Sequence, residues 1–173
     1  MAWVEDAGKE GMNVSETETG KVVRSVAELR ELIGQELGVG DWVEIDQDRV
    51  NAFADATGDH QFIHVDPERA KQTFFGGTVA HGYLTLSLIP YLGSHRGGVK
   101  IDLGGRMGVN YGLNKVRFPS PVPVGSRIRS RHKLVAVEEI GDKAVQMTTE
   151  VTVEVEGQEK PACVAETLSR TYF

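Results

Sequence analysis

One stretch constrains the fold more than any other: residues 78–92, Thr-Val-Ala-His-Gly-Tyr-Leu-Thr-Leu-Ser-Leu-Ile-Pro-Tyr-Leu. After its opening residues the stretch is apolar on almost every side, and a helix that is apolar all round is a buried helix. It is shorter than the ~20 apolar residues that a membrane span needs. We therefore expect a helix held inside a soluble fold. It should begin near His81-Gly82 and kink or end near Pro90, which cannot donate a backbone hydrogen bond.

The residues before this stretch predict further helices. Apolar residues recur at helical spacing in three runs, each preceded by a Ser or Asp that can cap a helix. The expected helices are 25–33, 47–56 and 67–75, capped by Ser25, Asp46 and Asp66. A short strand is expected at 40–45 and an irregular loop at 58–66.

The second half of the chain predicts strands. Apolar and polar residues alternate there with the period of two that is typical of strands, and Gly- or Pro-containing turns separate the runs. The expected strands are 99–103, 107–118, 126–139, 145–155 and 161–173. An antiparallel sheet long enough to curl around one apolar helix satisfies this pattern, so we expect an α+β fold.

The chain length, net charge and cysteine content favour a single cytoplasmic domain. The chain has 173 residues, and we expect a disordered leader over 1–22 followed by one domain over 23–173. A net charge of −6 argues against a nucleic-acid partner. No apolar run reaches membrane length, so no membrane partner is expected. The single Cys163 cannot form an internal disulfide, which fits a reducing cytosol, and a buried inert thiol is expected there.

Two loops that lead towards the central helix carry ionisable groups. The first offers Asp59 and His64, and the second offers His81-Gly82 at the expected helix start. A carboxylate and an imidazole that share one water form an acid–base pair. A helix start supplies unpaired backbone N–H groups, and Gly82 lets a substrate oxygen approach its N–H closely. These parts suit the addition of water to, or its removal from, carbons next to a carbonyl, because the oxyanion that develops needs fixed donors.

The same residues resemble a known signature. The chain reads Phe53-Ala-Asp-Ala-Thr-Gly-Asp-His-Gln-Phe-Ile-His-Val-Asp-Pro67 and then Phe75-Gly-Gly-Thr-Val-Ala-His-Gly82. This is similar to the Gly-Asp-x-Asn-Pro-Ile-His-x-Asp-Pro and Ile-Ala-His-Gly segments of the MaoC-like (R)-specific enoyl-thioester hydratases. The resemblance covers about 41–118 well. It departs at Gln61-Phe62, where the family usually has Asn-Pro, a change that should alter loop rigidity and leave the acid–base pair intact.

The resemblance implies a fold, a reaction and a set of site residues. It implies a hot-dog fold that is usually dimeric and acts on acyl-CoA or acyl carrier protein thioesters, with no metal or redox cofactor. Asp59 and His64 would activate the water, and the N–H of Gly82 would polarise the thioester carbonyl. The candidate substrate-binding residues are His81, Phe62, Tyr83 and Ser87.

Each residue alone also has a simpler interpretation. Asp59 could be a turn residue, and His64 a satisfied buried histidine. His81 is expected to orient the loop or contact the pair. His60 and His64 resemble a metal pair only if the segment is a helix, and its loop chemistry argues against metal. The basic alternation over 127–133 is expected to be a solvated face, with attraction of CoA phosphates as the minority alternative.

Two other functions remain open beside hydration. A thioester hydrolase on the same fold would attack the carbonyl carbon and release free thiol. A non-catalytic acyl-thioester-binding module, or a structural dimer partner, would bind ligand without turnover. The intact Asp59/His64 pair argues against the last, because a binder needs no acid–base pair.

Overall fold

The computed structural model describes residues 20–94 and 96–173, so most of the expected leader lies outside the described residues. Its helices are α1 (Val26–Arg30), α2 (Gln47–Thr57), α3 (Phe62–Val65), α4 (Pro67–Ala70), α5 (Gly82–Ser87) and α6 (Ile89–Ser94). Its strands are β1 (Val22–Val23), β2 (Glu36–Val39), β3 (Val43–Glu44), β4 (Lys100–Ile101), β5 (Met107–Arg117), β6 (Arg127–Ile140), β7 (Ala144–Val155) and β8 (Cys163–Tyr172).

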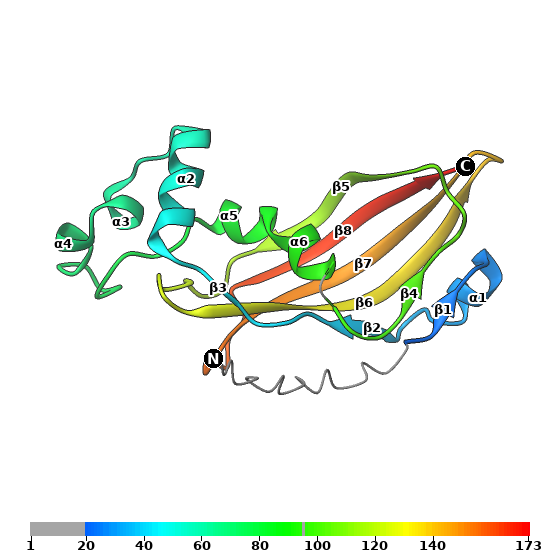
Figure 1. The fold of residues 1–173 in the computed structure, drawn as a ribbon, viewed down its shortest axis with the longest axis horizontal. Coiled ribbons are helices and arrows are strands. Elements are labelled where there is room, and N and C mark those ends of the chain that lie inside the picture. The colour runs from blue at the N-terminus through cyan, green and yellow to red at the C-terminus, as the bar shows by residue number, and fades with distance from the viewer. Residues whose placement is uncertain (1–19, 95) are drawn as a thin grey trace, which may run out of the picture.

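One antiparallel sheet forms the body of the molecule. Its strand order is β2-β6-β7-β8-β5, with β3 also paired to β6, while β1 and β4 form a separate parallel pair. The long strands bend beneath α5 and α6, and α2, α3 and α4 gather at the end of the sheet where α5 begins (Figure 1). The expected α+β, hot-dog architecture is confirmed.

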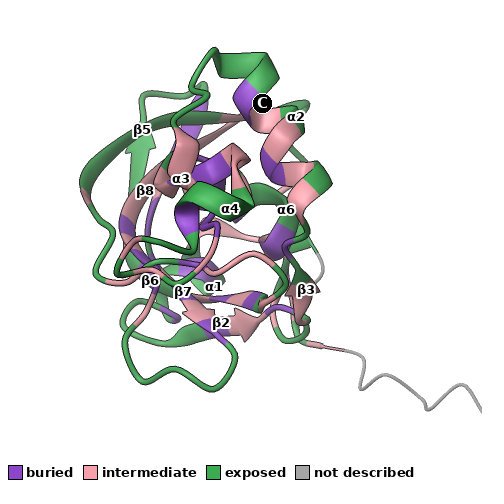
Figure 2. Ribbon diagram, turned by 90° about the vertical axis from the view of Figure 1, so that its left-hand side faces the viewer, coloured by how far each residue is buried: buried purple, intermediate pink, exposed green. Residues whose placement is uncertain are grey.

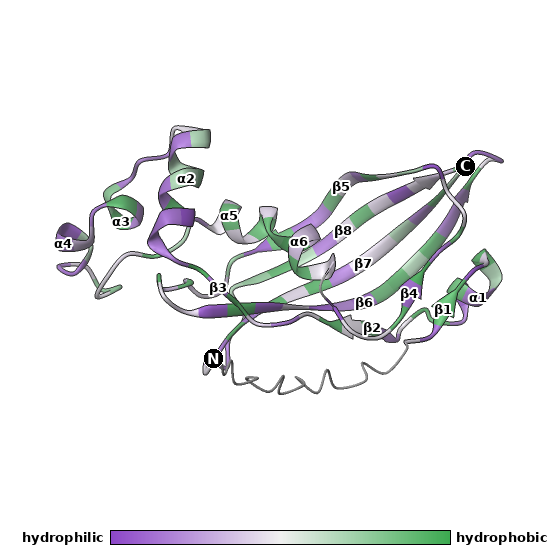
Figure 3. Ribbon diagram, in the orientation of Figure 1, coloured by the Kyte–Doolittle hydropathy of each residue, from purple (hydrophilic) through white to green (hydrophobic). Residues whose placement is uncertain are grey.

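The core lies between the sheet and the α5–α6 pair. Val151 and Val153 of β7 pack in the same cluster as Leu84, Ile89 and Leu92 of the helices, all of them buried. Figure 3 shows the alternation of apolar and polar residues along β6 and β7 that turns one face of the sheet towards this core. The alternation in the sequence therefore predicted these two strands correctly.

The central helix differs from the expectation in one respect. It does begin at Gly82, and it breaks at Leu88, next to Pro90. Complete burial, however, is wrong for the single chain: Tyr83 is 70% exposed and Tyr91 44% exposed. The sheet covers one face of the helix pair and leaves the other open, which an apolar sequence alone does not reveal.

Local pairing explains the other differences. The helix expected over 25–33 ends at Arg30, because the next residues turn at Gly34 (φ 86°) and form β2 against β6. The helix expected over 67–75 ends at Ala70, and the irregular loop contains the single turn α3. The caps at Ser25, Asp46 and Asp66 are confirmed, since each side chain accepts a backbone N–H of its helix.

Two further observations bear on the expectations. Cys163 is fully buried, and burial raises the pKa of its thiol to about 11, so the thiol is protonated and inert as expected. Within the described residues, no helix has the length and apolar character needed to cross a bilayer.

Candidate active site

His64 is held by a main-chain acceptor. The helix α2 ends at Gly58 in a left-handed conformation (φ 77°), and the turn of α3 then brings His64 inside, where it is 7% exposed. The His64 Nδ1 atom lies 2.6 Å from the carbonyl oxygen of Val79. Because a carbonyl can only accept, Nδ1 carries the proton, and Nε2 of the neutral ring presents a lone pair.

The surroundings of His64 favour that neutral ring. Burial lowers the pKa of His64, and the neighbouring His81 lowers it further, while the bond to the Val79 carbonyl and the charge of Asp59 act in the opposite direction. An imidazole that is neutral near pH 7 can accept a proton at Nε2. His64 is therefore suited to act as a general base.

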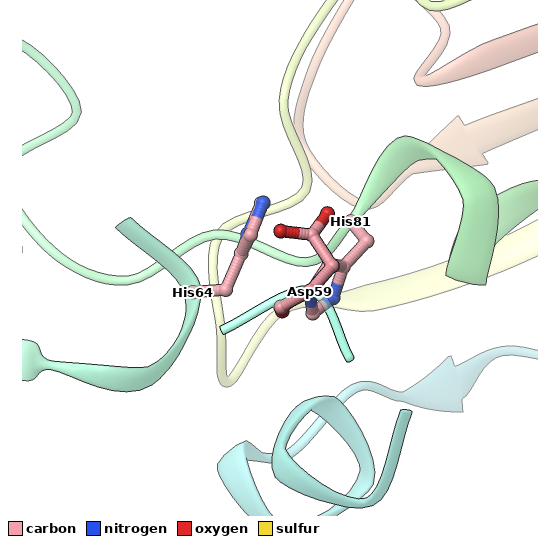
Figure 4. Close-up of side chains that lie close together, drawn as sticks. All are labelled: Asp59, His64 and His81. Atoms are coloured by element: carbon pink, nitrogen blue, oxygen red, sulfur yellow. The ribbon is translucent and has the colours of Figure 1, made fainter. Parts of the chain in front are cut away.

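Asp59, His64 and His81 converge. Each brings one side-chain oxygen or nitrogen atom to within 4.8 Å of the others, and Figure 4 shows the Asp59 carboxylate beside the distal end of the His64 ring. Asp59 is exposed and accepts one weak hydrogen bond, from the backbone N–H of Gln61 at 3.4 Å. Its carboxylate is thus accessible to a water molecule.

His81 orients the other two residues. Its Nε2 donates to the backbone oxygen of Asp59 at 2.9 Å, and its ring stacks on that of His64 with centroids 3.8 Å apart and planes inclined by 27°. Among the described residues its buried Nδ1 has no hydrogen-bond partner. These contacts match the expectation that His81 fixes the loop and touches the pair.

The same three residues are of metal-binding types, but their geometry is poor for a metal ion. A zinc ion bound about 2 Å from both imidazole nitrogens must lie close to both ring planes. The stacked rings of His64 and His81 do not offer such a common point. His60 lies outside this group and instead pairs with Asp55 at 2.8 Å.

Gly82 lines the same cavity as His64. Gly82 is the first residue of α5, so no carbonyl of that helix accepts its N–H. His64, Gly82 and Phe118 line one cavity of about 280 Å³. A Cβ at position 82 would lie 3.0 Å from the Phe118 ring, so any larger residue there would make the ring shift. The cavity is thus lined by an imidazole and by a glycine at a helix start, and the Asp59 carboxylate lies within 4.8 Å of that imidazole without being part of the lining.

The other candidate substrate-binding residues lie elsewhere. Phe62 packs under the guanidinium of Arg69, 4.3 Å from the ring centre, and Tyr83 stands edge-on to Phe118 with centroids 6.0 Å apart. Ser87 donates to the carbonyl of Tyr83 at 2.7 Å and lines a second cavity. None of these three is among the residues that line the small cavity, and their roles stay predictions.

Sequence reasoning missed the support behind His64. Gln47 Nε2 donates to the carbonyl oxygen of His64, and Gln47 Oε1 accepts from the hydroxyl of Thr78, both at 2.7 Å. Like the Val79 carbonyl, these contacts join α2 and α3 to the segment before α5. A Gln directly after the helix cap Asp46 was the only available signal, and it does not identify a partner.

The three arginines of the basic alternation in β6 pair with neighbouring carboxylates. Arg127 pairs with Glu156, and Arg129 with Glu154 at 2.6 Å. Arg131 pairs with Glu36 at 2.8 Å. These pairs favour the solvated face over a CoA phosphate site.

Comparison with known proteins gives consistent matches. The model of the MaoC like domain family matches residues 28–156. The chain is 56% identical over 150 residues to 3-hydroxyacyl-thioester dehydratase Z of Mycobacterium tuberculosis, covering 87% of this chain and 97% of that protein. It is 48% identical over 150 residues to nodulation protein N of Rhizobium leguminosarum bv. viciae, covering 86% and 92% of the two chains.

A solved structure agrees in fold. The (R)-hydratase from A. caviae involved in PHA biosynthesis superposes with a TM-score of 0.60 at 26% sequence identity. The match covers 79% of this chain and 94% of that chain. The similarity therefore extends over nearly the whole of the described domain.

Proposed function

This chain belongs to the MaoC-like dehydratase family, and from that premise we propose that it is an (R)-specific hydratase/dehydratase. It interconverts trans-2-enoyl-CoA and (R)-3-hydroxyacyl-CoA. One observation carries the proposal: His64, with its tautomer set by the Val79 carbonyl, lies beside Asp59 and shares a cavity with the amide of Gly82. A general base, a second polar group for the water and an oxyanion donor are what hydration of an enoyl thioester requires.

In the hydration direction, a water molecule lies between the Asp59 carboxylate and Nε2 of His64. The His64 ring accepts a proton as the water oxygen bonds to C3, and the C2–C3 electron pair moves towards the thioester carbonyl. The N–H of Gly82 donates to the oxygen on which negative charge develops. The acid–base pair then returns a proton to C2, so the site is regenerated, and dehydration follows the same steps in reverse.

The substrate class follows from the relatives. The mycobacterial relative is named for 3-hydroxyacyl thioesters and the A. caviae structure for (R)-hydration, and we carry both to this chain as part of the proposal. The thiol carrier is CoA or an acyl carrier protein. Because Arg127, Arg129 and Arg131 are engaged in ion pairs, other cations are the candidates for contacts with the phosphates of the carrier. Lys115 and Arg117 are two such cations, close in sequence to the cavity residue Phe118.

A homodimer completes the proposal. The strand β5 lies at one end of the sheet order and is exposed along almost its whole length (Figure 2). It displays Met107, Tyr111 and Leu113, which are 47–55% exposed, and a long apolar edge strand is a ready partner for another strand. Pairing of two copies along this edge is tested by sedimentation. Replacement of Leu113 by Lys should weaken the dimer.

The function is tested by two signals measured on one sample. Hydration of crotonyl-CoA and longer trans-2-enoyl-CoAs removes the absorbance of the conjugated thioester and releases no thiol, and chiral analysis should give the (R) product. Release of thiol would assign a thioesterase instead. Binding of the thioester with neither signal would assign a non-catalytic module and end the hydratase proposal.

A further inference from the structure

A second and larger cavity follows the first along the central helices. It has a volume of about 660 Å³ and lies between α5–α6 and strands β5 to β8. Gly82 and Thr85 line the small cavity, whereas Leu86 and Ile89 line the large one. At a rise of about 1.5 Å per residue, Leu86 lies roughly 6 Å further along the α5 axis than Gly82, and Ile89 follows at the start of α6. A chain that starts at the Gly82 amide and follows the helix therefore reaches this cavity.

The wall of the large cavity is polar on the side of the sheet. Asn110, Thr149 and Ser169 carry amide and hydroxyl groups on this side, and the Thr167 hydroxyl donates to the carbonyl oxygen of Thr149 at 3.2 Å, while Leu86 and Ile89 contribute apolar surface from the helices. No Asp or Glu is among the residues that line it, within the part of the chain that the structure describes. The cavity is thus apolar along the helix and supplied with hydrogen-bond donors opposite.

Arg96 is the one Arg or Lys among the residues that line this cavity, within the part of the chain that the structure describes. The residue is half-buried, and its Nη1 atom donates to the carbonyl oxygens of Leu37 and Val99, at 2.9 and 2.7 Å. Over residues 20–94 and 96–173, none of the ion pairs involves Arg96. Removing a charge from water is costly unless an opposite charge compensates it. The wall is therefore suited to a ligand that brings a negative charge.

His132 adds a neutral, fixed hydrogen-bonding group. It is buried, and its Nε2 lies 2.8 Å from the hydroxyl of the fully buried Ser130. Burial and the charge of Arg96 lower the pKa of His132 to about 4, so the ring is uncharged near pH 7. Its position is set by close packing, since a Cβ at Gly93 would lie 3.0 Å from the ring.

Building on the proposed function, we propose that the large cavity receives the far end of the acyl chain and selects acyl groups that end in a carboxylate. The apolar helix side accommodates the methylene chain. The Arg96 charge and the hydroxyl groups of the sheet meet the terminal carboxylate. The substrate class of this dehydratase is then the monothioesters of unsaturated or 3-hydroxylated dicarboxylic acids.

The test compares two substrates of equal length, trans-2-octenoyl-CoA and the monothioester trans-2-octenedioyl-CoA. Wild-type kcat/KM should be higher for the dicarboxylic substrate. In Arg96→Met the ratio of the two kcat/KM values should fall at least ~10-fold, the scale of losing a hydrogen bond to a charged group. Arg96→Lys should restore part of the ratio, and Lys143→Met, which removes an exposed cation from the β6–β7 turn, should leave it unchanged.

Several outcomes overturn the inference. The inference is overturned if the wild-type enzyme prefers the methyl-terminated substrate or turns over both substrates equally well. This result needs no variant, so it also decides the case in which Arg96→Met does not fold. An Arg96→Met variant that folds and keeps the wild-type ratio of the two kcat/KM values would also overturn it.

Failure of the proposed function is seen separately. It appears as the absence of turnover on every enoyl thioester. In that case calorimetric binding of saturated octanedioyl-CoA, compared with octanoyl-CoA, still decides whether the cavity selects a carboxylate.

Discussion

Two buried histidines of this molecule have opposite surroundings. His64 meets a main-chain carbonyl, a second imidazole and the nearby carboxylate of Asp59. His132 meets a serine hydroxyl and lies near the cation Arg96. Burial lowers the pKa of both. At His64 the carbonyl and carboxylate oppose that effect, whereas at His132 the guanidinium adds to it and the pKa falls to about 4. The same side chain is thereby available for proton transfer in one cavity and held neutral in the other.

The largest expected effect is on turnover at the first histidine. His64→Gln and Asp59→Asn should each lower kcat by ~10²–10⁴-fold with the fold intact, because general acid–base help is lost. His60→Gln and Asp55→Asn are matched controls, since that exposed pair lies in the same segment outside the site. Near-wild-type turnover in both site variants would contradict the acid–base role of Asp59 and His64. His64 and His132 would then no longer differ in function.

The second effect concerns stability at the other histidine. The unfolded His132 protonates near pH 6.5 and the folded one near 4, so between these values the unfolded state binds more protons and stability falls as the pH is lowered. At roughly 1.4 kcal/mol per pKa unit, the free energy of unfolding should decrease by about 3 kcal/mol from pH 7 to pH 4 on this account. Urea unfolding measures it. His132→Gln should show a shallower pH dependence, and an unchanged slope would contradict the assignment.

A third effect sharpens the role of the small cavity. Gly82→Ala keeps the amide but places a methyl group 3.0 Å from the Phe118 ring, so the ring or the helix start must move. Such a displacement near the reacting carbonyl should lower kcat/KM by up to ~10²-fold. The double variant Gly82→Ala/Phe118→Ala relieves the clash and should recover part of the loss. No recovery would mean that the ring is not the obstacle.

The smallest effect concerns the support behind His64. Gln47→Met removes the bonds to the His64 carbonyl and the Thr78 hydroxyl but leaves the Val79 carbonyl in place. We expect kcat to fall only about 3- to 10-fold, the scale of one or two neutral hydrogen bonds. The shape of the kcat pH profile should be unchanged. A shift of its acidic limb would show that Gln47 also sets the pKa of His64.

Much of this arrangement was predictable from the sequence. The alternation of Val151, Val153 and Val155 predicted β7 and its buried face, and the Asp46 cap predicted the start of α2. The spacing from Asp59 to His64 and on to His81-Gly82 predicted residues that lie close together, of which His64 and Gly82 line the small cavity. These features depend on local period and on short motifs, which act over a few residues.

The parts that were not predictable depend on distant contacts. The segment 36–39 became a strand because β6 lies beside it, and the exposure of Tyr83 follows from how far the sheet extends over the helix. The acceptor that orients His64 is the backbone oxygen of Val79, an atom that every residue possesses and that no motif marks. Arg96 and His132 are 36 positions apart in the chain, and nothing in their neighbourhoods signals that they share a cavity.

The use of that backbone oxygen has a consequence for how this protein can change over generations. Where a catalytic imidazole is oriented by a carboxylate side chain, one nucleotide substitution can delete the partner. Here a codon change at position 79 alters the valine side chain and leaves the oxygen in place, provided that the main chain keeps its course. A substitution of Val79 therefore keeps the backbone acceptor that fixes the tautomer of His64. The vulnerable positions are those that shape the path of the chain, namely the glycines and the packing residues around it.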